Sequence, residues 1–258
     1  MKIPKIIHYC WFGPKPIPNL ELKCMESWTK HLTDYKFMFW NEETFDIENS
    51  NEYVIGAYQK KMYAFVADYV RIHAMVKYGG VYLDTDIELL SPIDKFLENE
   101  AFTGFENKTK VAAGIMGCKK GNEVFKQMLD YYESVDFVNS KNDINITTIC
   151  SVMMNVIEGI GFEYKNSEQS FSNFHIYERD VFYPKKMKDD SFRVTDQSVS
   201  IHHYSGSWLT PRQKKRGENI IWRKVFRPIL IRVKAALSKL IGDGNTTKFE
   251  QRVRNWLR

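Results

Sequence analysis

Apolar and polar positions along the chain fall into segments that predict strands and helices by turns. Apolar runs rich in β-branched and aromatic residues predict strands at 5–13 and 35–41, and helical spacing between them predicts a helix over 20–32. Two strands separated by a helix are typical of a βαβ unit in a mostly parallel sheet. Further strands are expected at 81–83, 101–105, 111–118 and 197–208, and further helices at 123–135 and 146–161.

The clearest helical pattern spans 63–80. Its apolar residues cover most sides, so we expect the helix to be buried, and Gly79 with Gly80 supplies a stop because glycine tolerates the left-handed conformation at a helix end. These elements together predict an α/β fold, with a mostly parallel sheet flanked by helices.

Asp84 and Asp86 directly follow the apolar run 81–83, and Glu88 comes two residues later. Alternate residues of a strand face the same side, so the two aspartates are expected to point together at the carboxyl edge of the sheet. Carboxylates there suit Mg²⁺ or Mn²⁺, although a solvated acidic turn would have the same sequence. The buried strand before them favours the cation, because unpaired charge in a core is costly.

Asp68 and Arg71 are three residues apart in the buried helix and therefore share a face. On a helix surface such an ion pair would contribute little. In a desolvated place near a metal site the same pair could bind sugar hydroxyls or the charge of a phosphate.

Two further stretches carry residues suited to ligand binding. His202 and His203 are followed by a Gly/Ser loop and a tryptophan. One of the two histidines could be a metal ligand, or one could be a core residue and the other exposed. His8 and Trp11 come at the end of the first strand, where a nucleotide-binding sheet meets its nucleotide, and Trp11 either stacks on a base or packs in the core.

Four elements in this order resemble the DXD-containing sugar transferases of glycosyltransferase family 32. They are "IPKIIHYCWFG", "ADYVRIHAMVKYGGVYLDTDIELL", "VFYP" and "IHHYSGSW", and they cover roughly residues 3 to 210. The family includes bacterial capsular-polysaccharide transferases and yeast Golgi mannosyltransferases, and it is distantly similar to the large clostridial glucosylating toxins. The resemblance implies a GT-A-like fold, a nucleotide-sugar donor, an Mn²⁺ or Mg²⁺ ion and transfer with retention of configuration.

The resemblance also implies roles for individual residues. Asp86 is expected to bind the metal, and Asp84 the ribose, the donor sugar or the metal shell. The other expected contacts are Asp68 and Arg71 with the donor sugar, His8 and Trp11 with the nucleotide, His203 with the metal, and Gly206, Ser207 and Trp208 with the diphosphate. Glu106 and Asn107 are assigned to the acceptor side. The sequence does not decide between His202 and His203.

Charge is unevenly spread along the chain. Residues 212–258 hold 14 Lys/Arg and 3 Asp/Glu, a net charge of +11, so residues 1–211 carry −6 of the total of +5. Apolar residues between 222 and 241 have helical spacing, which predicts a basic amphipathic helical tail after a catalytic domain of residues 1–211. Such a helix suits an anionic membrane surface, but it could also pack on the domain or on a second subunit.

Cysteines and hydropathy indicate where the protein works. The four cysteines form no Cys-x-x-Cys motif and are expected to be reduced thiols. The N-terminal apolar run is too short for a signal peptide, and no stretch has the length of a membrane span. We therefore expect a cytoplasmic protein, and the basic tail would make it peripheral on the inner face of the membrane. The family resemblance implies a role in capsule or surface-polysaccharide synthesis, with a glycan or lipid-linked acceptor.

Two other functions remain open from the sequence. Asp86 and Glu88 form an Asp-x-Glu pattern that a two-metal nuclease could use, with the basic tail gripping nucleic acid. The acidic body argues against this, and we expect no nucleic-acid partner. A catalytically inactive membrane-surface scaffold is the other alternative. The sequence also leaves a homo-oligomer open.

Overall fold

The structure is a computed structural model that describes residues 2–107, 109–140, 142–187 and 191–206, together with 219, 229, 233 and 236. The chain divides into two compact units, 1–205 and 206–258. The expected boundary at residue 211 and nearly all of the expected tail lie outside the described residues, so both stay predictions. Within the second unit, Ile229, Val233 and Ala236 are helical and exposed.

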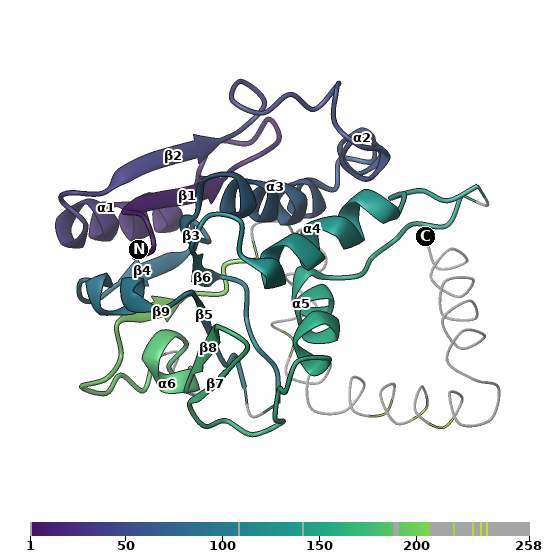
Figure 1. Cartoon of the computed structure of the whole chain (residues 1–258). Coiled ribbons are helices and arrows are strands. Elements are labelled where there is room, and N and C mark those ends of the chain that lie inside the picture. Colours follow the sequence, from purple (N-terminus) through teal and green to yellow (C-terminus); the bar gives the residue numbers. More distant parts are fainter. Residues whose placement is uncertain are drawn as a thin grey trace. The chain divides into compact units, whose positions relative to one another are not determined.

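A seven-stranded sheet forms the centre of the first unit, in the order β2-β1-β3-β6-β5-β8-β7 (Figure 1). Strands β6 and β7 run opposite to the other five, so the expected α/β fold with a mostly parallel sheet is confirmed. The strands are β1 (Ile6–Cys10), β2 (Lys36–Trp40), β3 (Gly80–Leu83), β5 (Ala101–Gly104), β6 (Ile115–Cys118), β7 (Gln169–Phe171) and β8 (Phe174–Tyr177).

A second, two-stranded sheet pairs β4 (Ile87–Leu89) with β9 (Ser200–His202) in antiparallel register. Ile87 lies opposite His202, and Leu89 lies opposite Ser200. The sequence predicted the late strand but not β4, whose three residues are too few to show a period.

Helices cover both faces of the large sheet, which is why its central strands are buried on both sides (Figure 1). Two hydrophobic clusters fill these layers: Tyr82 of β3 joins the cluster with α3, while Val81 and Leu83 join the cluster with α1. The helices are α1 (Asn19–His31), α2 (Glu52–Gln59), α3 (Tyr63–Tyr78), α4 (Glu123–Ser134), α5 (Ile149–Glu158), α6 (Arg179–Phe182) and a 3₁₀ helix, η1 (Asp94–Glu98).

The predicted βαβ unit is confirmed, since β1 and β2 pair in parallel on either side of α1 in the sequence. Helix α3 begins where expected and ends at Tyr78, one residue before Gly79, whose φ of +67° suits glycine. All four cysteines are unpaired. No helix among the described residues is both long enough and apolar enough to cross a membrane.

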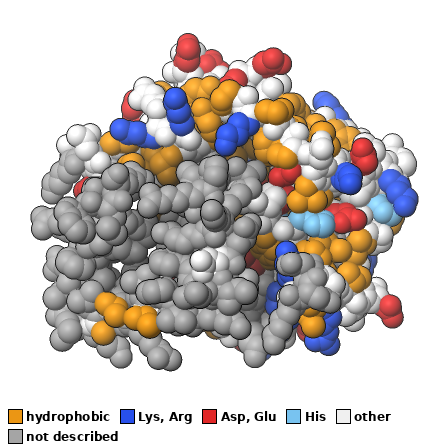
Figure 2. All heavy atoms as spheres, turned by 180° about the vertical axis from the view of Figure 1, so that it is seen from behind, with side chains coloured by type: hydrophobic (Ala, Val, Ile, Leu, Met, Phe, Trp, Pro, Cys, Tyr) orange, Lys and Arg blue, Asp and Glu red, His pale blue; other side chains and the backbone are white. Residues whose placement is uncertain are grey.

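Surface charge on the described part of the molecule is mixed. On the face drawn in Figure 2, Lys and Arg side chains lie scattered among Asp and Glu side chains and form no continuous basic stripe over the described residues. The electrostatic footprint of a nucleic-acid-binding groove is therefore missing from that part of the surface.

Candidate metal and donor site

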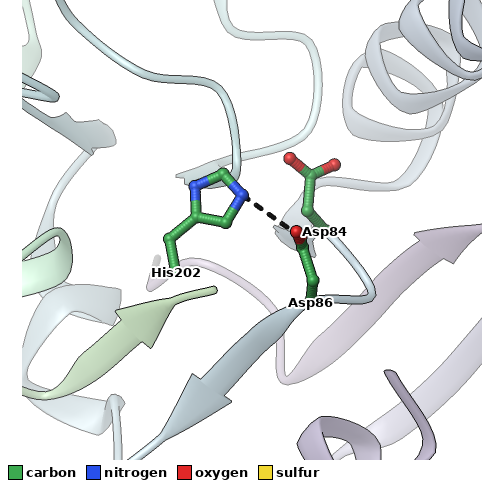
Figure 3. Close-up of side chains that lie close together, drawn as sticks. All are labelled: Asp84, Asp86 and His202. Atoms are coloured by element: carbon green, nitrogen blue, oxygen red, sulfur yellow. Dashed lines mark ion pairs between the residues drawn. The ribbon is translucent and has the colours of Figure 1, made fainter. Parts of the chain in front are cut away.

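Asp84 and Asp86 occupy a tight turn that joins the large sheet to the small one. The turn is closed by the Ile87 N–H, which donates to the Asp84 carbonyl oxygen at 2.9 Å, and the Asp84 N–H donates to Gly114 at 2.7 Å. The expectation that strand alternation aligns the two carboxylates is wrong, because neither residue lies in a strand. The turn brings them together instead (Figure 3).

His202 completes a cluster with the two aspartates. It ends β9, and its side chain reaches across to the turn, where Nε2 lies 3.2 Å from Asp86 Oδ1 (Figure 3). One ligand atom from each of Asp84, Asp86 and His202 lies within 4.8 Å of the others. Two segments distant in sequence, the turn after β3 and the end of β9, therefore converge on one point.

His203, the histidine selected from the sequence, lies elsewhere. Its Nε2 is 2.8 Å from Glu88 Oε2, and its backbone N–H donates to the Asp86 carbonyl oxygen at 3.0 Å. The structure therefore corrects the choice within the pair: His202 faces the aspartates, and His203 is engaged by Glu88. The sequence alone left this open because the chain turns sharply after β9, where Tyr204 has a φ of +52°.

Asp86 is held in its ionised form. Burial acts to raise the pKa of its carboxyl, but the hydrogen bond and charge of His202 and the N–H of Ser205 outweigh burial, and the pKa is lowered. Ser205 N–H donates to Asp86 Oδ2 at 2.8 Å. Burial likewise acts to lower the pKa of His202, yet Asp86 and then Asp84 and Glu106 raise it. The negative charge of these carboxylates, which favours a proton on the imidazole, would equally attract a metal cation.

Arg71 connects the helix to the cluster. Its Nη2 lies 3.2 Å from Asp68 Oδ1 and its Nη1 lies 3.0 Å from Asp84 Oδ1, and Nη1 also donates to the Ala113 carbonyl oxygen at 3.1 Å. The guanidinium lies over the Tyr82 ring at 4.4 Å, and the Tyr82 hydroxyl donates to the same Asp84 oxygen. The predicted desolvated pair is confirmed, but its contacts orient Asp84 and leave Asp84 Oδ2 for a ligand.

Asp68 is as buried as Asp86. Burial raises its pKa to about 6, although Arg71 opposes the shift. The group is 8% exposed, so any contact with a donor sugar would be through the small accessible part of the carboxyl. Its assigned role in sugar binding stays a prediction.

Gly114, which the sequence did not single out, allows the cluster to close. A Cβ at this position would lie 3.1 Å from Asp84 Oδ2 and 3.4 Å from His202 Cε1. The contact with Asp84 is tighter than most real Cβ contacts, so a side chain at position 114 would press on Asp84 where the loop before β6 meets the site. The run of small residues in "VAAGIMGC" was the only sign in the sequence of a close approach at this place. The sequence did not show that Asp84 and His202 are the residues approached.

His8 is not a donor contact in this structure. The side chain is fully buried, and its two ring nitrogens are both engaged: Trp40 Nε1–H donates to Nδ1 at 3.2 Å, and Nε2–H donates to the Gly79 carbonyl oxygen at 2.8 Å. Burial lowers the pKa of His8 to about 4, so it is neutral at physiological pH. This histidine ties β1 and β2 to the end of α3.

Trp11 follows the end of β1, as expected, and is partly exposed. Its indole N–H donates to the Lys15 carbonyl oxygen at 2.7 Å, and its backbone N–H donates to Trp40 at 3.0 Å. These bonds hold the ring on the loop after the strand. Stacking on a base stays a prediction.

Glu106 and Asn107 lie in the loop closed by the bridge between Phe105 and Val111. The charge of Glu106 contributes to raising the pKa values of His202 and Tyr204, which places Glu106 beside the cluster. The Asn107 side chain accepts a hydrogen bond from Thr109 N–H at 3.1 Å within the loop. Their acceptor role stays a prediction.

The loop after β9 is described as far as Gly206, which has a φ of +57°. Ser207 and Trp208, assigned to the diphosphate, lie outside the described residues. The part that is described, from His203 to Ser205, wraps around Asp86 through the two backbone hydrogen bonds already given.

The donor set fits a divalent cation. Two carboxylates and one imidazole offer oxygen and nitrogen ligands of the kind that Mn²⁺ accepts, and Mg²⁺ shares the preference for the carboxylates. The His202 Nδ1 atom is buried, and no described residue gives it a hydrogen-bond partner. The other ring nitrogen, Nε2, faces Asp86 and is the atom placed to bind a cation beside the two carboxylates (Figure 3).

Comparison with known proteins agrees with this geometry. Residues 18–103 match the family model described as "Glycosyltransferase sugar-binding region containing DXD motif", a span that includes both Asp84 and Asp86. This segment of the chain is therefore similar to the sugar-binding region of DXD-containing glycosyltransferases.

Curated relatives of the sugar-binding region come from fungi and a virus. An inositol phosphoceramide mannosyltransferase of Schizosaccharomyces pombe is 28% identical over 49% of this chain and 36% of its own length. An uncharacterized glycosyltransferase of Acanthamoeba polyphaga mimivirus is 30% identical over 56% of this chain and 60% of its own length. The matched segments thus span about a third to three fifths of these relatives.

Two solved glycosyltransferase structures are distantly similar to this chain. The PaToxG glycosyltransferase has 14% identity and a TM-score of 0.45 over 62% of this chain and 71% of its own. A glycosyltransferase involved in glycosylation of the major capsid of PBCV-1 has 12% identity and a TM-score of 0.46, over 79% of this chain and 96% of its own.

Proposed function

We propose that this protein is a metal-dependent glycosyltransferase that moves a sugar from a nucleotide-sugar donor to a glycan or lipid-linked acceptor. The observation that carries the proposal is that ligand atoms of Asp84, Asp86 and His202 lie within 4.8 Å of one another. The two aspartates belong to the segment that matches the DXD region, and His202 faces them from outside that segment. A buried strand end is a costly place for two carboxylates unless they hold a cation.

The chain's own residues would divide the work as follows. Asp86, Asp84 Oδ2 and His202 would hold a divalent ion, which supplies Lewis-acid stabilisation for the negative charge that develops on a departing nucleoside diphosphate. Arg71 and Tyr82 fix the orientation of Asp84. Trp11 would stack on the base, and Gly206, Ser207 and Trp208 would cover the diphosphate. We also propose that the sugar keeps its anomeric configuration on transfer, which the anomeric NMR signal of the product would report.

The chemistry of the site and the names of the relatives guide the choice of donor and acceptor. We favour a UDP-sugar and Mn²⁺, but two relatives bear the names of an inositol phosphoceramide mannosyltransferase and a mannosyl phosphorylinositol ceramide synthase, so a GDP-sugar must be tested equally. Both names describe sugar transfer to a lipid, which supports a lipid-linked acceptor. For this chain we propose a cytoplasmic enzyme, peripheral on the inner membrane face, in surface-polysaccharide synthesis.

A nuclease finds less support than a transferase. Glu88 binds His203 and does not join the cluster, so the Asp-x-Glu pattern does not converge on one metal position. An inactive scaffold would have no reason to keep Asp86 ionised in a largely buried place. Binding of a nucleotide-sugar with Mn²⁺ separates the transferase from both.

The test is donor hydrolysis with a panel of UDP- and GDP-sugars, including GDP-mannose, in Mn²⁺ or in EDTA. We expect one donor to release nucleotide in Mn²⁺ only, and Asp86→Asn to lower the rate at least about 100-fold because it removes a ligand of the catalytic ion. Glu88→Gln, two residues away and outside the cluster, is the matched control and should stay within about threefold.

Release that persists in EDTA or in Asp86→Asn would overturn the metal-dependent mechanism. If no donor is hydrolysed, calorimetric titration of the same panel with Mn²⁺ decides: binding without turnover indicates that acceptor is required. No binding of any donor would refute the transferase.

A further inference from the structure

The imidazole of His202 lies between an aromatic ring and a glycine. The Tyr204 ring stacks on it with centroids 4.0 Å apart and planes 25° apart, and Gly114 would bring a Cβ to 3.5 Å from Nδ1 if it carried one. Tyr183 touches the same imidazole at a tilt, with centroids 5.9 Å apart. The ring of His202 therefore occupies a narrow slot.

Hydrogen bonding does not fix this imidazole in the usual way. A metal-binding histidine commonly donates its second ring N–H to a carboxylate or a carbonyl oxygen, which sets the ring orientation. Here Nε2 lies near Asp86, but Nδ1 is buried with no partner among the described residues. The contact of Nε2 with Asp86 leaves the other edge of the ring without a hydrogen bond, so packing contributes to the orientation about the Cβ–Cγ bond, and Tyr204 supplies a parallel surface.

The backbone puts the Tyr204 ring there at a cost. Its φ of +52° is in the left-handed region that non-glycine residues rarely adopt, and such strain persists where the surroundings impose it. The residues on either side impose it, because His203 N–H donates to the Asp86 carbonyl oxygen and Ser205 N–H donates to Asp86 Oδ2. Asp86 thus shapes the loop that carries the ring back over His202.

We propose that Tyr204 is a positioning residue, whose ring holds the imidazole of His202 in the orientation that binds the divalent cation. The proposal rests on the cation site of the proposed function and assigns a role to a residue outside the DXD region. The aromatic face matters and the hydroxyl does not, since the contact with His202 is made by the ring.

Three variants separate the ring from the backbone and from the hydroxyl. Tyr204→Phe keeps the ring and removes the hydroxyl. Tyr204→Asn removes the ring, and it preserves the loop because asparagine tolerates the left-handed conformation. Tyr164→Asn, at an exposed tyrosine in the segment between α5 and β7, is the matched control for losing a tyrosine ring elsewhere.

The probe is Mn²⁺ alone, titrated by calorimetry and by electron paramagnetic resonance, with thermal unfolding measured beside it. We expect Tyr204→Asn to weaken Mn²⁺ binding at least about 10-fold, the size seen when groups that orient metal ligands are lost. Tyr204→Phe and Tyr164→Asn should stay within about twofold. The unfolding temperature of Tyr204→Asn should be no lower than that of Tyr164→Asn.

A second readout needs no metal. The stacked ring shields the His202 imidazole protons, so their NMR signals, assigned with His202→Gln, should shift upfield in the unaltered protein and in Tyr204→Phe but not in Tyr204→Asn. Equal Mn²⁺ affinity in Tyr204→Asn and the unaltered protein would overturn the positioning role. Failure of the unaltered protein to bind Mn²⁺ would refute the cation site itself, a result distinguishable because it needs no variant.

Discussion

At the scale of single residues, the geometry of the site depends also on residues that would not bind the cation themselves. Gly114 is the clearest case, because its missing side chain leaves room for Asp84 Oδ2 and for the His202 ring at the same time. A carboxylate and an imidazole that share one small space can be moved apart by a single methyl group. The positions of Asp84 and His202 therefore depend on the absence of a side chain at position 114.

Gly114→Ala is expected to weaken Mn²⁺ binding about 10-fold or more, since the new Cβ would lie 3.1 Å from Asp84 Oδ2 and displace it. Gly159→Ala is the matched control, because a Cβ there meets only the Val156 carbonyl oxygen at 3.5 Å, an ordinary contact. Titration with Mn²⁺ measures both. Unchanged affinity in Gly114→Ala would mean that the loop before β6 moves aside freely.

At the scale of elements, His8 joins three of them. It belongs to β1, accepts a hydrogen bond from Trp40 of β2 and donates one to Gly79 after α3. The neutral imidazole is required for this pattern, because a charged ring has no acceptor for the Trp40 N–H. Protonation of His8 would therefore loosen the start of the sheet and the segment that leads to Asp84.

The pH dependence of unfolding tests this. The folded pKa of His8, about 4, lies below the ordinary value of 6.5, so the unfolded chain binds the extra proton first and stability is lost as pH falls from 6.5 to 4. The loss approaches roughly 3 kcal/mol. Chemical denaturation at each pH should show a smaller acid loss in His8→Gln than in the unaltered protein.

Asp68→Asn is a control that should change the acid loss of stability in the opposite direction. Burial raises the folded pKa of Asp68 to about 6, above its ordinary 3.8, so its contribution to stability is present at low pH and is lost as pH rises from about 4 to 6. Removing it should make the acid loss larger than in the unaltered protein. Shifts of the same sign in both variants would contradict the two assignments.

Elements also mark the limit of prediction from sequence. Helix α3, β1 and β3 could be predicted because each has a clear period or a long apolar run. Asp84, Asp86, Asp68 and Arg71 could be selected because their spacing is local. The choice of His202 over His203, and the need for Gly114, depend on a turn at Tyr204 and a contact between distant loops, which no local spacing encodes.

At the scale of the whole molecule, charge separates the two units. Residues 212–258 hold a net charge of +11, against −6 for the rest. Ile229, Val233 and Ala236, the helical tail residues that the structure describes, present apolar side chains to solvent. Apolar exposure beside a strong positive charge suits an anionic lipid surface.

The tail is therefore expected to carry the protein to anionic vesicles. Replacing Arg223, Lys224, Arg227 and Lys234 by glutamate in the full chain should abolish co-sedimentation with vesicles containing phosphatidylserine, since each basic residue contributes about 1 kcal/mol near such a surface. Neutral phosphatidylcholine vesicles are the control for apolar binding alone. Equal sedimentation of the variant and the unaltered chain would contradict a membrane-binding tail.

The turn that carries Asp84 and Asp86 joins the large sheet to the small one, and β9 of the small sheet is the last of the described strands to be synthesised. Glu88 and His203 are separated by 115 positions in the chain, and the pairing of β9 with β4 accompanies the contact of His202 with Asp86. A ribosome that has completed the first half of the protein has made both aspartates but not their imidazole partner. The cluster can therefore be complete only in a chain whose synthesis has passed β9.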